Sequence, residues 1–194
     1  MAEPLRIATF NTELSRAGPG LLLRDIAKGA DPQITAVTRL LADVAADIIV
    51  LQGVDYDLGG TTLGALADRL GEAGPSYPYR FALPPNAGRP TGLDMDGDGK
   101  AGGARDGQGY GRFFGAGAMA ILSRYPIDQQ ERWALPLIDE QDGLTQYFFL
   151  RRCLLTARIN VPGVEPLQCA CVHTSAFASG NTKRWQFDAL GRYL

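Results

Sequence analysis

Hydrophobic residues recur along the chain with two spacings, one typical of strands and one typical of helices. Short apolar runs at 5–10, 47–52, 79–83 and 117–123 predict strands, and the run at 47–52 holds four consecutive aliphatic residues, as in a strand buried on both faces. Between the first two runs, apolar residues follow at helical spacing. They are Ile34, Val37, Leu40, Leu41 and Val44. The order strand, helix, strand predicts a βαβ crossover.

Capping residues predict where the first helices begin and end. Gly29 follows the apolar segment 21–28 and is expected to cap that helix at its C-terminus. Asp31 followed by Pro32 is typical of a helix N-cap and first helical position. A further helix is expected at about 61–70.

The second half of the chain predicts antiparallel strands. Segments 126–133, 147–160 and 167–173 have strand character, and the last two flank VPGVEP, which predicts a hairpin connection. A last helix is expected at 182–194. The early crossover followed by these strands indicates an α/β (α+β) fold with mixed sheets.

Composition narrows the class of protein. The chain has 194 residues, of which 45% are hydrophobic and 21% charged, as in globular proteins. A formal net charge of −2 argues against a protein that coats nucleic acid by bulk charge, although a local basic cleft remains compatible with it. No run of 18 apolar residues occurs, so no membrane span is expected. The N-terminus has no signal peptide, and both a cytoplasmic location and a periplasmic or secreted one after leader removal stay open.

Three cysteines, Cys153, Cys169 and Cys171, are present, and no CxxC motif of the metal-binding type occurs. Their odd number excludes complete internal pairing. Cys169 and Cys171 are two residues apart, which in a strand places both side chains on one face. We interpret the cysteines as buried apolar residues.

Polar residues follow three of the predicted strands at their C-terminal ends. Asn11 and Glu13 follow the first strand, Asp55 and Asp57 the second, and His173 the last. Ligands of open α/β sheets gather at such ends. Amide and carboxylate oxygens suit a hard divalent cation, and the single histidine suits proton transfer or orientation of a water. If the three strands are neighbours, these side chains are expected to form one pocket. Taken singly, each also fits a turn former, a solvated acid or a strand-end histidine.

A long loop rich in glycine, proline and aspartate is expected at about 84–115. Its DMDGDG stretch matches the first positions of a calcium loop, although Arg105 stands where a glutamate is expected and no helices flank it. The candidate calcium ligands are Asp94, Asp96, Asp98 and Asp106. A solvated turn is the alternative. Arg112, in the same loop, is a candidate phosphate contact or a solvated charge.

Four stretches, in order, resemble one known family. ATFNTEL, DIIVLQGVD, GAMAILSRYPI and VHTSAF followed by RWQF are similar to the endonuclease/exonuclease/phosphatase superfamily, which is related to pancreatic-type deoxyribonuclease. The triplet DYD and the DxDGDG loop resemble a bacterial branch of it. The resemblance implies a four-layer α/β sandwich with mixed sheets, present in part or in full. It also implies hydrolysis of phosphodiesters or phosphomonoesters with Mg²⁺ or Mn²⁺, the substrate being a small molecule, a lipid head group or a nucleic acid.

The resemblance also implies roles for individual residues. Asn11 matches an asparagine that helps to bind metal or the substrate phosphate, and Glu13 falls where some members carry an additional metal-binding acid. His173 matches a histidine that supports leaving-group or phosphate chemistry.

Three departures from the family pattern count against activity. Gly53 stands where the metal-binding glutamate is expected, so Glu13, Asp55 or Asp57 would have to replace it. Ala116-Gly117-Ala118 replaces Gln-Tyr-Gly. The Gly-Asp-x-Asn and terminal Asp-His motifs of the family's second half are not in the sequence.

The third departure predicts a single domain over 1–194 that is incomplete at its C-terminus. The second sheet would then be largely absent, and the first would expose an apolar face. We therefore expect a dimer, a partner chain that supplies the missing half, or a fragment of a longer protein.

Two hypotheses follow. The first is a metal-dependent hydrolase acting on phosphate esters. The second is a catalytically degenerate module of the same fold that binds calcium or another ligand.

Overall fold

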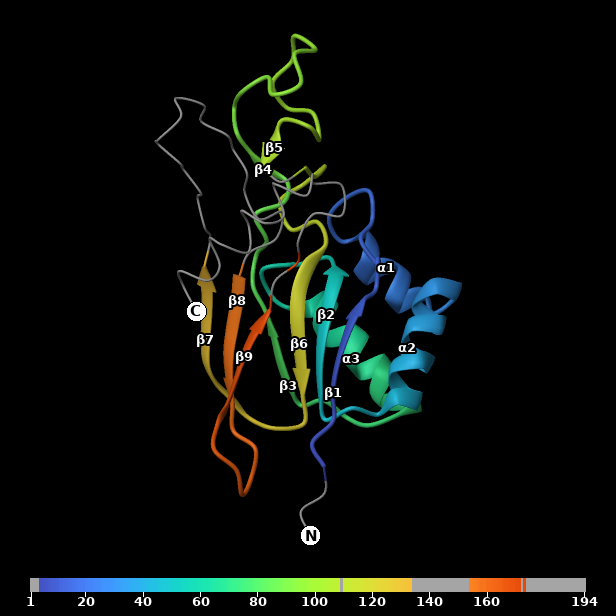
Figure 1. Ribbon diagram of the computed structural model, residues 1–194. Helices are drawn as coiled ribbons and strands as arrows, with labels where there is room; N and C mark the ends of the chain where they lie inside the picture. Colours follow the sequence, from blue (N-terminus) through green and yellow to red (C-terminus); the bar gives the residue numbers. More distant parts are fainter. Residues whose placement is uncertain (1–3, 109, 134–153, 172, 174–194) are drawn as a thin grey trace, which may run out of the picture.

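Two β-sheets pack face to face at the centre of the protein, and three helices cover the outer face of the first sheet (Figure 1). The structure is a computed structural model and describes residues 4–108, 110–133, 154–171 and 173. The described part therefore has three layers: helices, first sheet and second sheet. This is an α/β fold, as the sequence predicts, and the helix expected at 182–194 lies outside the described residues.

The first sheet has four strands in the order β1-β2-β6-β3. They are β1 (Ile7–Asn11), β2 (Ile48–Val54), β3 (Tyr79–Ala82) and β6 (Ala118–Ser123). β1 and β2 are parallel, and β6 runs antiparallel to both β2 and β3, so the sheet is mixed. All six residues of β6 are buried, as expected for a central strand whose two faces are both covered.

Local sequence determines the ends of the helices. Helix α1 (Leu21–Lys28) ends at Gly29, whose φ of 70° is left-handed. Helix α2 (Pro32–Val44) begins after Asp31, whose carboxylate accepts a hydrogen bond from the Ile34 amide at 2.9 Å. Both caps confirm the sequence prediction. Helix α3 (Thr61–Ala73) runs three residues beyond the end expected for it.

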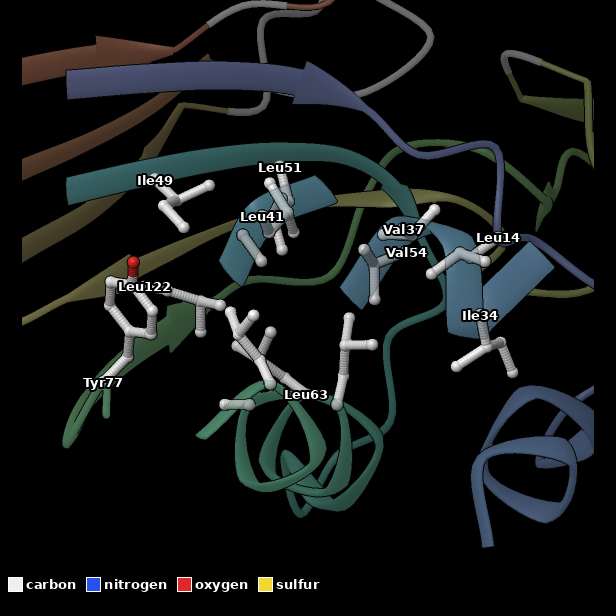
Figure 2. Packing of buried hydrophobic residues seen from close by; sticks show 14 of the residues in the cluster. Leu14, Ile34, Val37, Leu41, Ile49, Leu51, Val54, Leu63, Tyr77 and Leu122 are labelled. Atoms are coloured by element: carbon white, nitrogen blue, oxygen red, sulfur yellow. The ribbon is translucent and has the colours of Figure 1, made fainter. Parts of the chain in front are cut away.

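The apolar faces of the helices form one core with the first sheet. Figure 2 shows Ile34, Val37 and Leu41 of α2 packed toward β2, with Leu63 of α3 beside them. The helix predicted from this spacing is present, although Leu40 and Val44 of the apolar pattern are 45% and 40% exposed. The buried stripe of α2, with Ile34, Val37, Thr38 and Leu41, is therefore narrower than the apolar pattern.

The second sheet has three strands in the order β7-β8-β9. They are β7 (Ile127–Trp133), β8 (Leu154–Ile159) and β9 (Leu167–Cys171). Both pairings are antiparallel, and the β8–β9 hairpin confirms the turn predicted for VPGVEP. This sheet lies against the face of the first sheet that the helices leave open (Figure 1).

A second hydrophobic core fills the space between the sheets. Leu155, Ala157 and Ile159 of β8 pack there with Val50 of β2 and Ile121 of β6. Burying each large aliphatic side chain stabilises the fold by about 1.5–3 kcal/mol. The expectation that the second sheet would be largely absent was therefore wrong. The described part of the sheet covers β2, β3 and β6 on the apolar face from which we expected a dimer or a partner chain, whereas Ile7 of β1 is 52% exposed.

The long connection between β3 and β6 stands beyond the ends of the strands (Figure 1). It contains a two-stranded ladder of β4 (Arg89–Pro90) and β5 (Gly107–Gln108), which the sequence did not predict. Within the described residues, no helix combines the length and apolar character that crossing a bilayer requires.

Candidate functional site

The C-terminal ends of β1 and β2 define the edge of the first sheet where the predicted site residues begin. The two strands are parallel neighbours, with Asn11 paired to Gln52. The arrow of β9 ends toward the same edge, and the loop between β3 and β6 also starts there (Figure 1). The topology therefore brings these chain segments to one end of the sandwich.

Asn11 and Gly53 lie next to each other at this edge. Ala8 and Phe10 pack on the helix-side core, so strand alternation places Thr9 and Asn11 on the face that carries the second sheet. Gln52, on the same side, donates to the Thr9 hydroxyl at 2.9 Å. A Cβ on Gly53 would lie only 3.0 Å from Asn11 Oδ1.

Gly53 has a backbone conformation that disfavours any other residue. Its φ is 78°, and it lies at a register shift between β2 and β6. A Cβ there would also lie 2.9 Å from the backbone nitrogen of Glu13. The loop after β1 thus occupies the space where a side chain at position 53 would begin. A Gly53→Glu substitution would strain this contact and is a poor way to restore a metal ligand.

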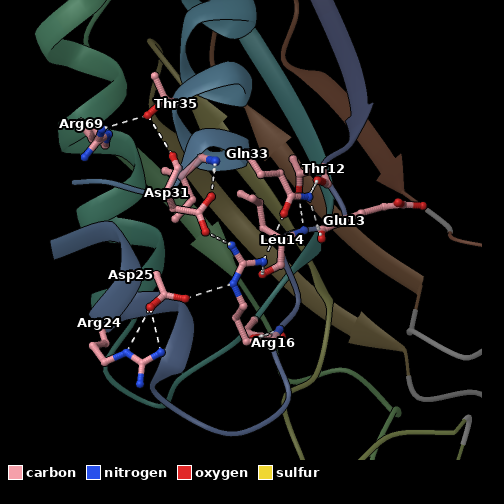
Figure 3. A network of polar contacts seen from close by, with 12 residues as sticks. Thr12, Glu13, Leu14, Arg16, Arg24, Asp25, Asp31, Gln33, Thr35 and Arg69 are labelled. Atoms are coloured by element: carbon pink, nitrogen blue, oxygen red, sulfur yellow. Dashed lines mark hydrogen bonds and ion pairs between the residues drawn. The ribbon is translucent and has the colours of Figure 1, made fainter. Parts of the chain in front are cut away.

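Glu13 extends from the loop after β1 with a left-handed φ of 51°. Gln33, in the first turn of α2, donates its side-chain amide to the carbonyl oxygens of Thr12 and Glu13 at 3.2 and 3.0 Å. Figure 3 shows the Glu13 side chain directed away from the polar network around Arg16. It is exposed, and no group in the described part of the chain donates a hydrogen bond to its carboxylate. The loop thus presents one exposed acid, whose backbone lies beside Gly53.

Arg16 ties this loop to the helices. Its guanidinium contacts Asp25 of α1 at 3.2 Å and Asp31, the N-cap of α2, at 2.9 Å (Figure 3). It also donates to the Leu14 carbonyl at 3.1 Å. Hydrogen bonds from Arg24 and Arg16 lower the pKa of Asp25, which keeps this carboxylate charged. The network therefore positions the loop that carries Glu13.

Asp55 is buried behind the site and acts as a backbone anchor. Its carboxylate accepts hydrogen bonds from the Ser15 hydroxyl at 2.7 Å and from the amides of Arg16 and Gly117 at 2.8 Å each. It thereby joins the loop after β1 to the start of β6. Three donors saturate most of its acceptor capacity, which favours a structural role over the predicted metal-binding one.

Asp57 caps helix α3. It accepts hydrogen bonds from the backbone amides of Thr61 and Thr62 at 2.8 and 2.6 Å. Burial acts to raise the pKa of Asp57, but the hydrogen bonds from Thr62, Thr61 and Gly59 outweigh it and lower this pKa below its ordinary value. The structure thus directs Asp57 at the helix terminus, away from Asn11 and Glu13.

The acidic loop brings three of its four predicted ligands together. Oxygens of Asp94, Asp96 and Asp106 all lie within 4.8 Å of one another. Asp98 lies outside this group, and its carboxylate accepts from the Lys100 amide at 2.8 Å. Asp106 therefore occupies the place that the sequence analysis gave it as a substitute for the expected glutamate.

Asp106 also organises the loop around itself. Its buried carboxylate accepts from the amides of Gly102, Met95 and Gly103 at 2.9, 2.8 and 2.6 Å. These hydrogen bonds lower the pKa of Asp106. The group is charged at neutral pH, so the two neighbouring carboxylates bring negative charge close to a fixed anion, an arrangement that a cation would stabilise.

Arg112 lies beside the same loop. It lines a cavity of about 210 Å³ with Asp106, Phe113, Phe114 and several glycines. Its side chain is exposed. The cavity is separate from the contact between Asn11 and Gly53, because none of its lining residues belongs to β1 or β2.

His173 follows β9 by two residues and is half-buried. Cys171, at the end of β9, packs in the core between the sheets with Met119 and Val50. Met119 pairs with Gln52, one residue before Gly53. The strand that precedes His173 thus ends in the same core as Met119, the register partner of Gln52.

Sequence reasoning missed the residues that support the site. Gln33, Arg16 and Ser15 make contacts over sequence separations of 20 to 40 residues. No local motif marks such pairs. The one available signal is their place beside a predicted N-cap and immediately after a predicted strand end.

The donor set fits a hard divalent cation. Asn11 offers an amide oxygen next to Gly53, and the backbone of Glu13 lies there as well, with its carboxylate exposed to solvent. These are the ligand types that Mg²⁺ and Mn²⁺ take in proteins.

Two solved structures share the fold of this chain. The chain matches an endonuclease/exonuclease/phosphatase from Beutenbergia cavernae DSM 12333 with a TM-score of 0.57 and 18% identity, covering 98% of this chain and 43% of that one. It matches humanized D. rerio TDP2 with a TM-score of 0.50 and 16% identity, covering 96% of this chain and 57% of that one. The chain thus spans about half the length of these structures.

No curated protein matches the sequence. The model of the Endonuclease/Exonuclease/phosphatase family, however, matches residues 8–192, nearly the whole chain. This match includes all of the strand-end residues described above. The chain therefore belongs to the Endonuclease/Exonuclease/phosphatase family.

Proposed function

We propose that the protein is a metal-dependent phosphoesterase whose site lies at the C-terminal ends of β1 and β2. The observation that carries this proposal is the placement of Asn11 beside Gly53, with Glu13 held next to them in a left-handed conformation. Family membership supports hydrolysis of phosphate esters as the class of reaction. It also favours an enzyme over a degenerate binding module.

Glu13 replaces the acid that is missing at position 53. Of the three acids that could do so, Asp55 and Asp57 are saturated by backbone and hydroxyl donors, whereas the Glu13 carboxylate is available. Glu13 and Asn11 would hold Mg²⁺ or Mn²⁺, which polarises a phosphoryl oxygen and stabilises the charge that develops during hydrolysis.

Two further residues, His173 and Arg112, would bind the phosphate group or transfer a proton. His173, at the end of β9, is the single imidazole of the chain and therefore the candidate to move a proton or bind a phosphate oxygen. Arg112 presents an exposed guanidinium from the loop beyond the same edge, where it would contact a phosphate group of the substrate. Phosphodiesters and phosphomonoesters of small molecules, lipid head groups or nucleic acids all fit this chemistry.

The loop acids Asp94, Asp96 and Asp106 hold a second cation, for which Ca²⁺ is the best match. Ca²⁺ accepts six to eight oxygens in flexible loops, and this loop offers carboxylates together with carbonyls. Its role would be to order the loop beside the site.

The test is hydrolysis of bis-p-nitrophenyl phosphate with Mg²⁺ or Mn²⁺. Release of p-nitrophenol should require the metal and should be lost in His173→Ala and Glu13→Gln. Glu72→Gln makes the same chemical change at an exposed position near the C-terminal end of α3 and should retain activity. No turnover with any divalent ion, in a chain that includes any natural continuation, would reject the proposal.

A further inference from the structure

Two thiols on β9 lie close enough to react with each other. The Sγ atoms of Cys169 and Cys171 are 3.5 Å apart, and neither residue forms a disulfide in the structure. Strand alternation places both side chains on the same face, as the sequence predicts. Cys171 is buried in the core between the sheets, whereas Cys169 is partly exposed. The pair thus combines one accessible thiol with one protected thiol.

The environment activates the accessible thiol. The hydrogen bond from Cys171 lowers the pKa of Cys169, and this effect outweighs burial, which acts to raise it. A lower pKa increases the fraction of thiolate, the form that attacks oxidants. The two sulfurs are in hydrogen-bond contact at 3.5 Å, so the Cys171 sulfur already faces the atom with which it would react.

The backbone can accommodate a bond between the two sulfurs. Residues two apart in a strand have Cα atoms about 6.6 Å apart, within the range of about 4.4–6.8 Å that disulfides span. β9 pairs with β8 alone among the described strands, so its other edge is not held by a second described ladder. Edge strands tolerate the local bending that closure of the sulfurs requires.

We propose that Cys169 and Cys171 form a reversible disulfide in response to a hydroperoxide. The Cys169 thiolate attacks the peroxide, so that an S–O bond forms and the O–O bond breaks, and the departing oxygen takes up a proton to give water or an alcohol. The Cys171 sulfur then attacks Cys169, so that the S–S bond forms and the S–O bond breaks, and the oxygen leaves with the thiol proton as water. The sulfurs lose two electrons, which reduce the peroxide.

The bond would act on the strand-end site, and this part of the inference rests on the proposed function. Closure brings the sulfurs from 3.5 Å to about 2.05 Å and bends the end of β9. His173 follows Cys171 by two residues, so it moves with this end. A displacement of about 1 Å is enough to lower a rate about a hundredfold.

Peptide mass mapping tests the disulfide without reference to activity. The full chain with Cys153→Ser is treated with hydrogen peroxide, alkylated with N-ethylmaleimide and digested with trypsin. The peptide 159–183, which holds both thiols, should become two hydrogens lighter and resist alkylation, and dithiothreitol should reverse the change. In Cys171→Ser, Cys169 should proceed to sulfenic and sulfinic acid, whereas in Cys169→Ser the remaining thiol should stay reduced. Sulfinic acid on Cys169 beside an alkylatable Cys171, or linkage between chains, would overturn the proposal.

Phosphoesterase assays of the same samples test the coupling to His173. Activity should fall at least tenfold on oxidation, recover with dithiothreitol, and stay high in peroxide-treated Cys169→Ser. Formation of the disulfide with unchanged activity would overturn the coupling. Formation of the disulfide in a protein that has no activity in either state would support the thiol pair and reject the proposed function.

Discussion

The acids at the strand ends and the acids of the long loop use their carboxylates in different ways. At the strand ends, Asp55 and Asp57 each accept hydrogen bonds from backbone groups and point to separate parts of the molecule. In the loop, Asp94, Asp96 and Asp106 accept backbone hydrogen bonds as well, yet their oxygens converge within 4.8 Å.

This difference shows that a cluster of acids in the sequence does not identify a metal site by itself. The short triplet DYD follows a strand, and its two acids are captured by the nearest unpaired amides, those of a helix terminus and of neighbouring loops. The loop acids are spaced along a glycine-rich turn, which brings oxygens of Asp94, Asp96 and Asp106 within 4.8 Å of one another. Glu13 belongs to neither group, because its carboxylate has no donor in the described structure.

Asp55→Ala should have the largest effect on stability. It leaves three donors without their buried acceptor, so the free energy of unfolding should fall by about 3 kcal/mol. Urea unfolding followed by circular dichroism measures the change, and Asp43→Ala, at an exposed position of α2, is the matched control. A loss below about 1 kcal/mol would show that the anchor is dispensable.

Asp106→Asn should lower Ca²⁺ affinity about tenfold or more, because it removes the one buried charge of the cluster. Isothermal calorimetry gives the affinity. Asp98→Asn is the matched control, since it makes the same chemical change in the same loop at an acid outside the cluster of Asp94, Asp96 and Asp106. Equal losses in both variants would contradict the geometry and indicate that the loop binds Ca²⁺ through its net charge.

Glu13→Gln should weaken Mn²⁺ binding at the strand ends roughly tenfold, while leaving the unfolding midpoint unchanged. Asp57→Asn should do the reverse, with a lower midpoint and unaltered Mn²⁺ affinity. Electron paramagnetic resonance of Mn²⁺, recorded in the Asp106→Asn background to silence the loop, separates the two. Loss of Mn²⁺ binding in Asp57→Asn alone would reassign the ligand.

Gln33→Met should have a smaller effect on the same measurement. It removes the donors to the carbonyls of Thr12 and Glu13, a loss of about 1 kcal/mol in positioning, or about fivefold in Mn²⁺ affinity. Gln168→Met, on the exposed side of β9, is the control. Unchanged affinity in Gln33→Met would mean that the Arg16 network alone holds the loop.

The sequence predicts most of the described elements because their signals are local. Asp31-Pro32, Gly29 and the aliphatic run of β2 each act within a few residues, and each feature is where the pattern placed it. The failures come from interactions between distant segments. Leu40 and Val44 are exposed because the surface against which α2 packs buries a narrower stripe than the apolar residues of this helix would fill. The second sheet was underestimated because β7 and the β8–β9 hairpin pair with one another over a long separation in the sequence.

The candidate site could be predicted in part. The strand-end position of Asn11 follows from the βαβ pattern, but the left-handed turn at Glu13 depends on Gln33 and on the absence of a Cβ at Gly53, three segments that meet only in the fold. The separation of Asp55 from Asp57 likewise depends on which amides lie within reach, and the helix terminus that captures Asp57 belongs to the next element along the chain.

Asp57→Asn should have the smallest effect, a change in how the free energy of unfolding depends on pH in the acid range. Hydrogen bonds lower its pKa in the folded protein, so its contribution is present above the unfolded value of about 3.9 and is lost as pH falls through the folded value. The difference in unfolding free energy between the wild type and Asp57→Asn should therefore be constant near pH 6 and shrink below about pH 4. Thr62→Val, which removes the side-chain donor and keeps the backbone donors, should show the same trend with a smaller amplitude. A difference that persists undiminished at pH 3 would mean that Asp57 stabilises α3 through shape and packing, and that the charge on its carboxylate has no part in the cap.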